Sequence, residues 1–258
     1  MKTKSLGFIG GGRITKVMLQ VITNNKTEYK AIVVYDTNPL VLAALKKQFP
    51  VITVADSDME PAKQDMVFIA LHPPVILAAL DLVKDQFKPG SVLISLAPTI
   101  SIEKIASLLP NFKNIVRLIP NATSIVNEGY NPVCFAKEMT DWKKQTMLTI
   151  FRRMGRTFEV PEQKLESYAI MSAMLPTYFW FQWKELIDIG IRIGLTEDES
   201  RNSLRDTMLA AIRTYFYSGL NPDEVMDLIP VKPIAEYEEQ IKTMYKEKLI
   251  PLYEKIKP

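Results

Sequence analysis

Three consecutive glycines near the start of the chain, Gly10 to Gly12, constrain its fold more than any other feature. A short apolar run, residues 5–9, precedes them, and apolar residues at helical spacing follow from Ile14 to Val21. The pattern predicts a buried strand, a tight turn and the N-terminus of a helix, where free N–H groups and the helix dipole favour an anion. The sequence therefore predicts a site for the phosphates of a dinucleotide.

A second apolar run, residues 31–35, ends in Asp36, close to the spacing expected for an acid that binds ribose hydroxyls. A carboxylate there repels a 2′-phosphate, so Asp36 favours NAD(H), although its polar neighbours still leave NADP(H) open. The glycine pattern is imperfect, because Thr15 stands at the third glycine position. An alternative interpretation of the acid is a plain turn, in which Asn38 caps a helix that begins at Pro39.

Apolar runs and helical patterns alternate along the next part of the chain. The continuous run 66–71 is typical of a strand covered on both faces, and it stops at His72. Connections are short, which favours an α/β fold with a doubly wound, mostly parallel sheet. The lone Cys134 lies in an apolar, strand-like run, so we expect a buried structural thiol. Further strands are expected at 51–54, 91–96, 114–118 and 157–160, and helices from Pro39 to Phe49, after His72, and at 101–109 and 141–154.

The alternation stops at Pro161, which predicts two domains, residues 1–160 and 161–258. The second domain is all helical, and its helix after Pro176 is apolar nearly all round, with five aromatic residues between Tyr178 and Trp183. A helix without a polar face must be covered on every side, so the pattern predicts a homodimer with this helix at its centre. Helices are expected at 163–175, 176–194, 197–217 and beyond Pro222.

Charge and composition exclude several classes of partner. The 32 basic and 29 acidic residues are mixed along the chain, so nucleic acid is not expected. The most apolar window, residues 170–183, is broken by Pro176 and Gln182 and is shorter than the roughly 20 residues of a membrane span, so no membrane is expected. A single cysteine fits a reducing compartment, and we expect a cytoplasmic protein that acts on a small molecule.

The order of these motifs resembles one family, the pyrroline-5-carboxylate reductases of proline synthesis. The opening residues 7–12 resemble that family's start, and 71–73 stand where it commonly has Lys-Pro. Residues 95–101 resemble its Ser-x-Ala-Ala-Gly-Val-Thr segment, with Pro98 and Thr99 in place of the small pair. Residues 117–122, followed by Glu128 and Gly129, are similar to its Arg-x-Met-Pro-Asn-Thr-Pro and later Gly.

The resemblance implies a Rossmann-type N-terminal domain, an all-α dimerisation domain and hydride transfer from NAD(P)H to a cyclic imine. It implies no metal and no covalent intermediate. The pyrophosphate would bind at the glycine turn and the adenosine ribose at Asp36, whereas a second group would line the nicotinamide half. The implied cofactor residues are Gly10, Gly12, Arg13, Ile14, Asp36, His72, Pro73, Ala97 and Asn121.

Departures from the family fall in the second domain. Where the family has Ser-Gly-Ser-Gly-Pro-Ala, residues 172–177 read Ser-Ala-Met-Leu-Pro-Thr, which places Ser172 and Thr177 beside the substrate. The family's loop that cradles the substrate carboxylate has lost both glycines here. Lys232 is a candidate to replace its backbone donors with a charge, and an ordinary solvent-exposed lysine is the alternative. Thr207 persists where the family often places a hydroxyl near the substrate nitrogen; an ordinary helical threonine, bonded back to its own helix, is the alternative.

The expected activity is therefore an NAD(P)H-dependent reductase of a small cyclic imine, either pyrroline-5-carboxylate or a different small substrate. A protein that binds NAD(P) without turnover is the alternative, because the substrate loop is not retained. A β-hydroxyacid dehydrogenase is disfavoured, since the Gly-x-x-x-Lys-x-x-x-Asn pattern of that group does not occur after Pro161.

Overall fold

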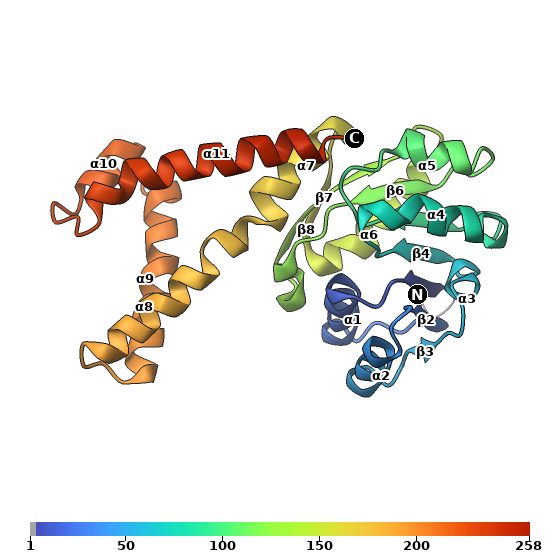
Figure 1. The fold of residues 1–258 in the computed structure, drawn as a ribbon, viewed down its shortest axis with the longest axis horizontal. Coiled ribbons are helices and arrows are strands. Elements are labelled where there is room, and N and C mark those ends of the chain that lie inside the picture. Colours follow the sequence, from blue (N-terminus) through green and yellow to red (C-terminus); the bar gives the residue numbers. More distant parts are fainter. Residues whose placement is uncertain (1–3) are drawn as a thin grey trace. The chain divides into compact units, whose positions relative to one another are not determined.

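The computed structural model describes residues 4–258, which alternate strands and helices as far as Glu159 (Figure 1). The strands are β1 (Ser5–Ile9), β2 (Ala31–Tyr35), β3 (Thr53–Val54), β4 (Met66–Ile69), β5 (Val92–Ser95), β6 (Ile115–Leu118), β7 (Gly129–Phe135) and β8 (Gly155–Glu159). The helices between them are α1 (Arg13–Asn24), α2 (Pro39–Gln48), α3 (Met59–Ala62), α4 (Pro73–Val83), η1 (Lys84–Gln86), α5 (Ile102–Leu108), η2 (Ala122–Val126), α6 (Asp141–Phe151) and η3 (Arg152–Met154).

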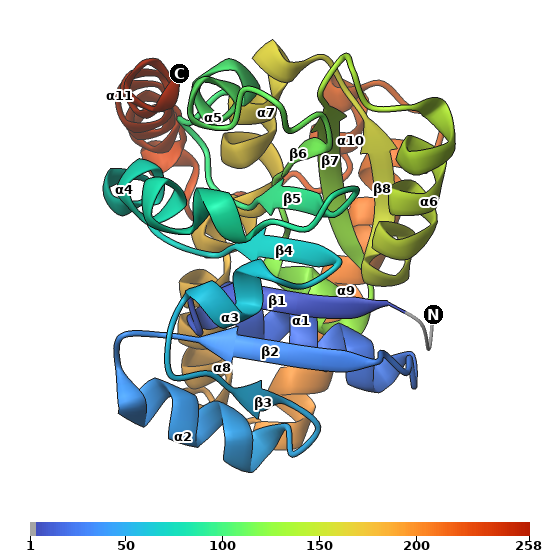
Figure 2. The ribbon, with the colours of Figure 1, turned by 90° about the vertical axis from the view of Figure 1, so that its right-hand side faces the viewer.

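The eight strands form one sheet in the order β3-β2-β1-β4-β5-β6-β7-β8, which Figure 2 shows from the side. Every neighbouring pair is parallel except β6 with β7. The predicted α/β sheet is therefore confirmed. The chain moves outward from β1 in one direction to β2 and β3 and then crosses to β4 on the other side, so the strand order reverses between β1 and β4.

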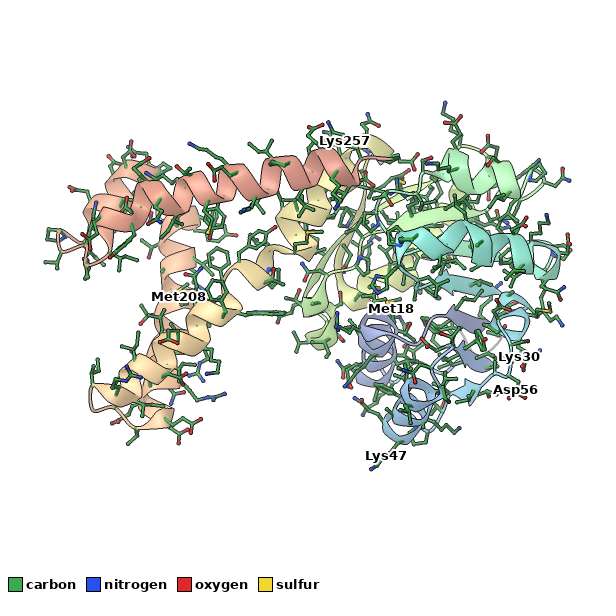
Figure 3. The ribbon with its side chains drawn as sticks, in the orientation of Figure 1. Met18, Lys30, Lys47, Asp56, Met208 and Lys257 are labelled. Atoms are coloured by element: carbon green, nitrogen blue, oxygen red, sulfur yellow. The ribbon has the colours of Figure 1, made fainter. Side chains whose placement is uncertain are left out.

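Two apolar layers cover the two faces of the sheet. One layer packs α1, α2 and α6 on the sheet and includes Met18, which points into it (Figure 3). The other layer packs α3, α4 and α5 on the opposite face. Phe8 and Phe68 are paired on neighbouring strands, and their rings stack with centroids 4.7 Å apart. Burial on both faces explains why β4 reads as a continuous apolar run and why β1, β5 and β6 are mostly apolar.

The chain divides into two compact units, which are described separately. Unit 1 contains the sheet, runs to Met174 and also includes Leu252–Pro258. Unit 2 is Leu175–Pro251. The division falls after Met174, whereas the domain boundary that the sequence predicts is at Pro161, and the predicted boundary stays a prediction. The remaining helices are η4 (Glu162–Lys164), α7 (Leu165–Tyr168), the π-helix η5 (Ala169–Ala173), η6 (Leu175–Tyr178), α8 (Trp180–Arg192), α9 (Glu197–Tyr217), α10 (Pro222–Asp227), η7 (Ala235–Tyr237) and α11 (Glu238–Ile256).

Unit 2 is helical and has almost no interior. Gly190 and Ser200 are its buried residues, at the point where α8 meets α9. The Ser200 hydroxyl donates to the Ile187 carbonyl oxygen at 2.9 Å, and a Cβ on Gly190 would lie 2.2 Å from the same Oγ. The two helices therefore approach so closely that only glycine fits at position 190. Apolar side chains on the outside of this unit include Phe181, 65% exposed, and Tyr217, 82% exposed.

The segment 163–175 differs from the single helix that its sequence predicts. It is a succession of 3-10, α and π turns, η4 to η6. Ser172 Oγ donates to the Tyr168 carbonyl at 2.7 Å, and the Ser172 carbonyl accepts from the Asn121 side chain at 2.8 Å. These bonds compete with a regular helical ladder. Among residues 4–258, no helix has both the length and the apolar character needed to cross a membrane.

Candidate functional site

The residues predicted to hold a dinucleotide gather at one edge of the sheet in unit 1. The glycine turn follows β1, Asp36 follows β2, His72 follows β4, Ala97 follows β5 and Asn121 follows β6. These five strands are parallel, so their carboxyl ends share one edge. This edge, at the point where the strand order reverses, is where open α/β sheets bind ligands.

The glycine turn is rigid at Gly10. Its φ is +103°, a conformation that side-chain-bearing residues rarely adopt, and a Cβ there would lie 2.4 Å from the Ala70 carbonyl oxygen. Its N–H donates to the Tyr35 carbonyl at 2.8 Å. Thr15, at the third glycine position, is fully buried, and its hydroxyl donates to the Gly10 carbonyl at 2.6 Å. The bulkier side chain is accommodated because it hydrogen-bonds to the turn itself.

The space around Gly12 is open, whereas neighbouring atoms crowd Gly10. A Cβ on Gly12 would meet nothing within 4 Å, so the fold itself does not require glycine here. Gly12 is the N-cap of α1, and no side chain caps that helix end. Arg13 is exposed and Ile14 half-buried in the first turn. An uncapped helix N-terminus with no side chain over it has the geometry that a pyrophosphate needs.

The carboxylate of Asp36 accepts hydrogen bonds from backbone N–H groups near it. Its Oδ2 accepts from Gly11 N at 2.8 Å, and its Oδ1 accepts from Asn38 N at 2.8 Å. Asn38 Oδ1 in turn accepts from Leu40 N at 3.0 Å, so the predicted cap of the helix that begins at Pro39 is confirmed. Each oxygen of Asp36 keeps acceptor capacity for a ribose hydroxyl. The ribose role stays a prediction.

A cavity of about 520 Å³ adjoins Asp36 at the ends of β2 and β3. Its charged lining residues are Asp36, Lys46 and Asp56, the last of which lies directly after β3 (Figure 3). Lys46 Nζ donates to the carbonyl oxygens of Pro50 and Ile52 at 2.9 and 2.5 Å. The cavity therefore presents two carboxylates and one ammonium whose protons are directed at the backbone.

The nicotinamide side of the predicted site has a different character. His72 is an exposed N-cap of α4, and Pro73 and Pro74 follow it without N–H groups. This helix end therefore presents proline rings, and it has few backbone N–H groups that could donate a hydrogen bond to a ligand. Ala97 is buried two residues after the end of β5. Asn121 is buried, and its amide oxygen accepts from Thr123 while its amide nitrogen donates to Ser172.

Arg117 was identified only as part of a motif, and the structure gives it a specific environment. Its side chain is completely buried. Nη1 lies 2.9 Å from Glu162 Oε1, and Nη2 lies 2.5 Å from Glu166 Oε1. Both glutamates lie far from Arg117 in the sequence, 45 and 49 positions further along, and no motif singles them out. The adjacent cysteine is inert as expected, because burial, together with the charge of Glu162, raises the pKa of the Cys134 thiol to about 12.

The predicted substrate and catalytic residues are divided between the units. Ser172 is buried in η5 of unit 1, with its hydroxyl bonded to the backbone. Thr177, Thr207 and Lys232 are exposed residues of unit 2. Within the described chain the Thr214 hydroxyl donates back to Ala210 at 3.0 Å, and Thr207 makes no such bond. Ser172 reaches the cofactor edge through its carbonyl, which accepts from the Asn121 side chain at 2.8 Å, whereas the other three residues belong to the second unit. The roles of all four stay predictions.

Known proteins are similar to this chain in its N-terminal part and over most of its length. Residues 5–99 match the family model of the NADP oxidoreductase, coenzyme F420-dependent. The chain is 25% identical over 228 residues to the pyrroline-5-carboxylate reductase of Escherichia coli, covering 88% of this chain and 84% of that protein. It is 26% identical over 209 residues to that of Mycobacterium leprae, covering 79% of this chain and 70% of the relative.

Solved structures share the fold. The Plasmodium falciparum pyrroline carboxylate reductase with NADP bound superposes with a TM-score of 0.81 at 22% identity, covering 99% of this chain and 96% of that one. The Streptococcus pyogenes 1-pyrroline-5-carboxylate reductase gives a TM-score of 0.77 at 17% identity, covering 99% and 97%. The resemblance extends through unit 1 and unit 2 alike. The chain is similar over most of its length to pyrroline-5-carboxylate reductases, at about 25% identity, and it shares their fold.

Proposed function

We propose that this protein is an NAD(P)H-dependent reductase of pyrroline-5-carboxylate or a closely related small cyclic imine. The observation that carries the proposal is the open glycine turn at Gly12, at the edge where five parallel strands end, in a chain whose relatives with this name match it over 88% of its length. A reduced nicotinamide bound there supplies a hydride to the imine carbon. The protein has to hold the two reacting carbons together.

We assign the following roles to the residues of this site. The first turn of α1, with Gly12, Arg13 and Ile14, would bind the pyrophosphate, because its N–H groups are uncapped. Asp36 and the adjoining cavity of about 520 Å³ would hold the adenosine. His72 and Ala97, at the ends of β4 and β5, would border the nicotinamide half. Ser172, Thr177 and Lys232 would contact the substrate, and Thr207 would hold a hydroxyl near its nitrogen.

NAD(H) is the proposed preference over NADP(H). A 2′-phosphate needs a cation, whereas the adenosine cavity has two carboxylates, and its single lysine donates to backbone carbonyls. Extra phosphate charge would be repelled there. The Plasmodium falciparum relative was solved with NADP bound, so the two cofactors have to be compared directly.

Titration with NADH and NADPH, followed by turnover with a panel of cyclic imines, tests this function. We expect both reduced cofactors to bind, NADH at least about fivefold more tightly, a difference of about 1 kcal/mol. We also expect oxidation of the bound cofactor when pyrroline-5-carboxylate is added. Tight binding without consumption of cofactor by any imine would instead support a protein that binds NAD(P) without turnover, which the loss of glycines in the exposed segment 229–234 favours.

A homodimer through unit 2 is also proposed. Unit 2 exposes large apolar side chains on α8, α9 and α11, including Trp180, Phe216 and Met244, and its buried residues are only Gly190 and Ser200. A helical unit with so little interior is unstable in water unless another surface covers it. The cytoplasmic location expected from the single cysteine likewise stays a prediction.

Sedimentation at micromolar concentration tests the dimer. We expect a species of twice the chain mass, and a thermal midpoint that rises with protein concentration because association stabilises the folded state. A stable monomer whose midpoint is independent of concentration would contradict the dimer. The cofactor titration is independent of this result, since the nine cofactor residues belong to unit 1.

A further inference from the structure

The connection between β5 and α5 contains a strained residue. Thr99 has a φ of +73°, and a β-branched side chain in this region is a genuine outlier. Such strain persists where surrounding bonds over-determine the backbone, and it often marks a functional site. Thr99 lies two residues after Ala97, at the edge where the cofactor is proposed to bind.

Two carboxylates hold this connection at its backbone. Glu166 Oε1 accepts from Thr99 N at 3.3 Å, and Glu162 Oε1 accepts from Ile102 N at 2.7 Å. The same two oxygens accept from the terminal nitrogens of Arg117, at 2.5 and 2.9 Å respectively. One guanidinium thus fixes both glutamates, and each glutamate fixes one end of the segment 99–102.

The guanidinium is itself held in place by the sheet. Arg117 lies on β6 opposite Ser95 of β5, and both side chains are fully buried. Arg117 Nε and Ser95 Oγ find no hydrogen-bond partner among the described residues. Buried charges without water are tolerated only where they are paired and well oriented, so the cluster has little freedom to move. Its rigidity is transmitted to the segment it binds.

We propose that Glu162 and Glu166 are positioning residues for the dinucleotide. Anchored by Arg117, they hold the segment 97–102 in the strained shape that borders the nicotinamide half. Neither glutamate is required to touch cofactor or substrate, and their effect passes through the backbone N–H groups of Thr99 and Ile102. The inference rests on the proposed function, in which this edge binds NAD(P)H.

Ile102 offers a way to cut one tether from the side of the segment 99–102, with Arg117 and both glutamates left in the chain. Ile102 is the first residue of α5, and Ser101 before it has ψ of 159°, a conformation compatible with a following proline. Ile102→Pro replaces the N–H that donates to Glu162 by a ring carbon, which also displaces the Glu162 carboxylate from the segment. Ile102→Ala removes the side chain and keeps the N–H. The comparison of these two variants isolates the tether.

The measurement is the Kd of NADH and NADPH by fluorescence, with KM and kcat for the cofactor, well below the unfolding temperature of each variant. We expect Ile102→Pro to raise Kd and KM about tenfold over Ile102→Ala, as for a lost hydrogen bond to a charged group, with kcat at saturation within about twofold. If the tether only stabilised the fold, its loss would lower stability without raising Kd and KM while kcat stays unchanged. Equal Kd values for the two variants would overturn the inference.

Glu166 gives a second test, with a control at the opposite edge of the sheet. Glu166→Ala should weaken cofactor binding about tenfold, and Glu166→Gln, which keeps an acceptor oxygen for Thr99, should restore most of it. Asp65 also accepts from a backbone N–H, that of Ser5 at 2.8 Å, at the amino end of β1. Asp65→Ala should lower stability and leave Kd unchanged; a Kd shift equal to that of Glu166→Ala would overturn the inference.

The two possible failures are distinguishable. If the wild-type protein binds neither NADH nor NADPH, the proposed function fails, and the inference fails with it. If the wild type binds a cofactor and the tether variants bind it equally well, the proposed function stands and only the positioning role is refuted.

Discussion

Replacing Gly12 by alanine should remove dinucleotide binding from a protein that stays folded. A Cβ at this position meets no protein atom within 4 Å, and the backbone, with φ of −69° and ψ of −165°, suits any residue. The methyl group would instead occupy the approach to the first turn of α1, where a pyrophosphate has to come close to the backbone. We expect at least a tenfold rise in Kd for NADH, with a loss of stability below about 1 kcal/mol.

Gly10 provides the matched comparison. Gly10→Ala places a Cβ 2.4 Å from the Ala70 carbonyl oxygen and forces a φ of +103° on a residue with a side chain. Steric overlap and backbone strain together should lower the free energy of unfolding by about 2–5 kcal/mol. Chemical denaturation and cofactor titration of both variants separate the effects. If Gly12→Ala binds NADH as tightly as the wild type, the helix end is not the pyrophosphate site.

Arg117→Ala should be among the most destabilising substitutions in the chain. It would leave Glu166, 1% exposed, as a buried carboxylate without its cation. Breaking a buried pair from one side costs about 3–5 kcal/mol, because the remaining charge is neither paired nor solvated. The midpoint of urea unfolding measures this loss, and a decrease below about 1 kcal/mol would show that the cluster contributes little to stability.

Two further variants show whether the loss of stability comes from the unpaired buried charge. Arg201→Ala removes an arginine of the same charge whose pair with Glu197 is exposed on both sides, and it should change stability by less than about 0.5 kcal/mol. Arg117→Met combined with Glu166→Gln removes the two fully buried charges and should recover a large part of the loss, because the remaining carboxylate, Glu162, is 32% exposed and can be solvated. Failure of the double variant to recover any stability would attribute the loss to packing instead.

Much of unit 1 could be predicted from the sequence, because its strands are covered on both faces and read as mostly apolar runs. The glycine turn, β4 with its end before His72, and the cap at Asn38 all follow from local patterns. The direction in which each strand runs was harder to predict. β7 was expected only as a strand-like run around Cys134, and its antiparallel pairing with β6 depends on how η2 turns the chain.

Other features depend on contacts that no local pattern contains. Glu162 and Glu166 look like ordinary acids of a helical segment, and only the position of β6 beside β5 brings Arg117 to them. Thr99 is equally invisible in the sequence, because nothing local requires a positive φ at a threonine. In unit 2 the apolar excess is evident from the aromatic run at 178–183, but no local pattern says which surface covers it.

The course of the chain through unit 1 has a consequence for biosynthesis. Unit 2 is, in topology, an insertion: the chain leaves unit 1 after Met174 and returns to it at Leu252, next to Pro251 within α11. Ile256, buried near the end of the chain, belongs to the first unit. Since a nascent chain emerges from its N-terminus, the sheet can form before unit 2 has been synthesised, but the place of Ile256 in unit 1 is filled only after residues 175–251 have been made. The first unit to begin folding is therefore the last to be completed.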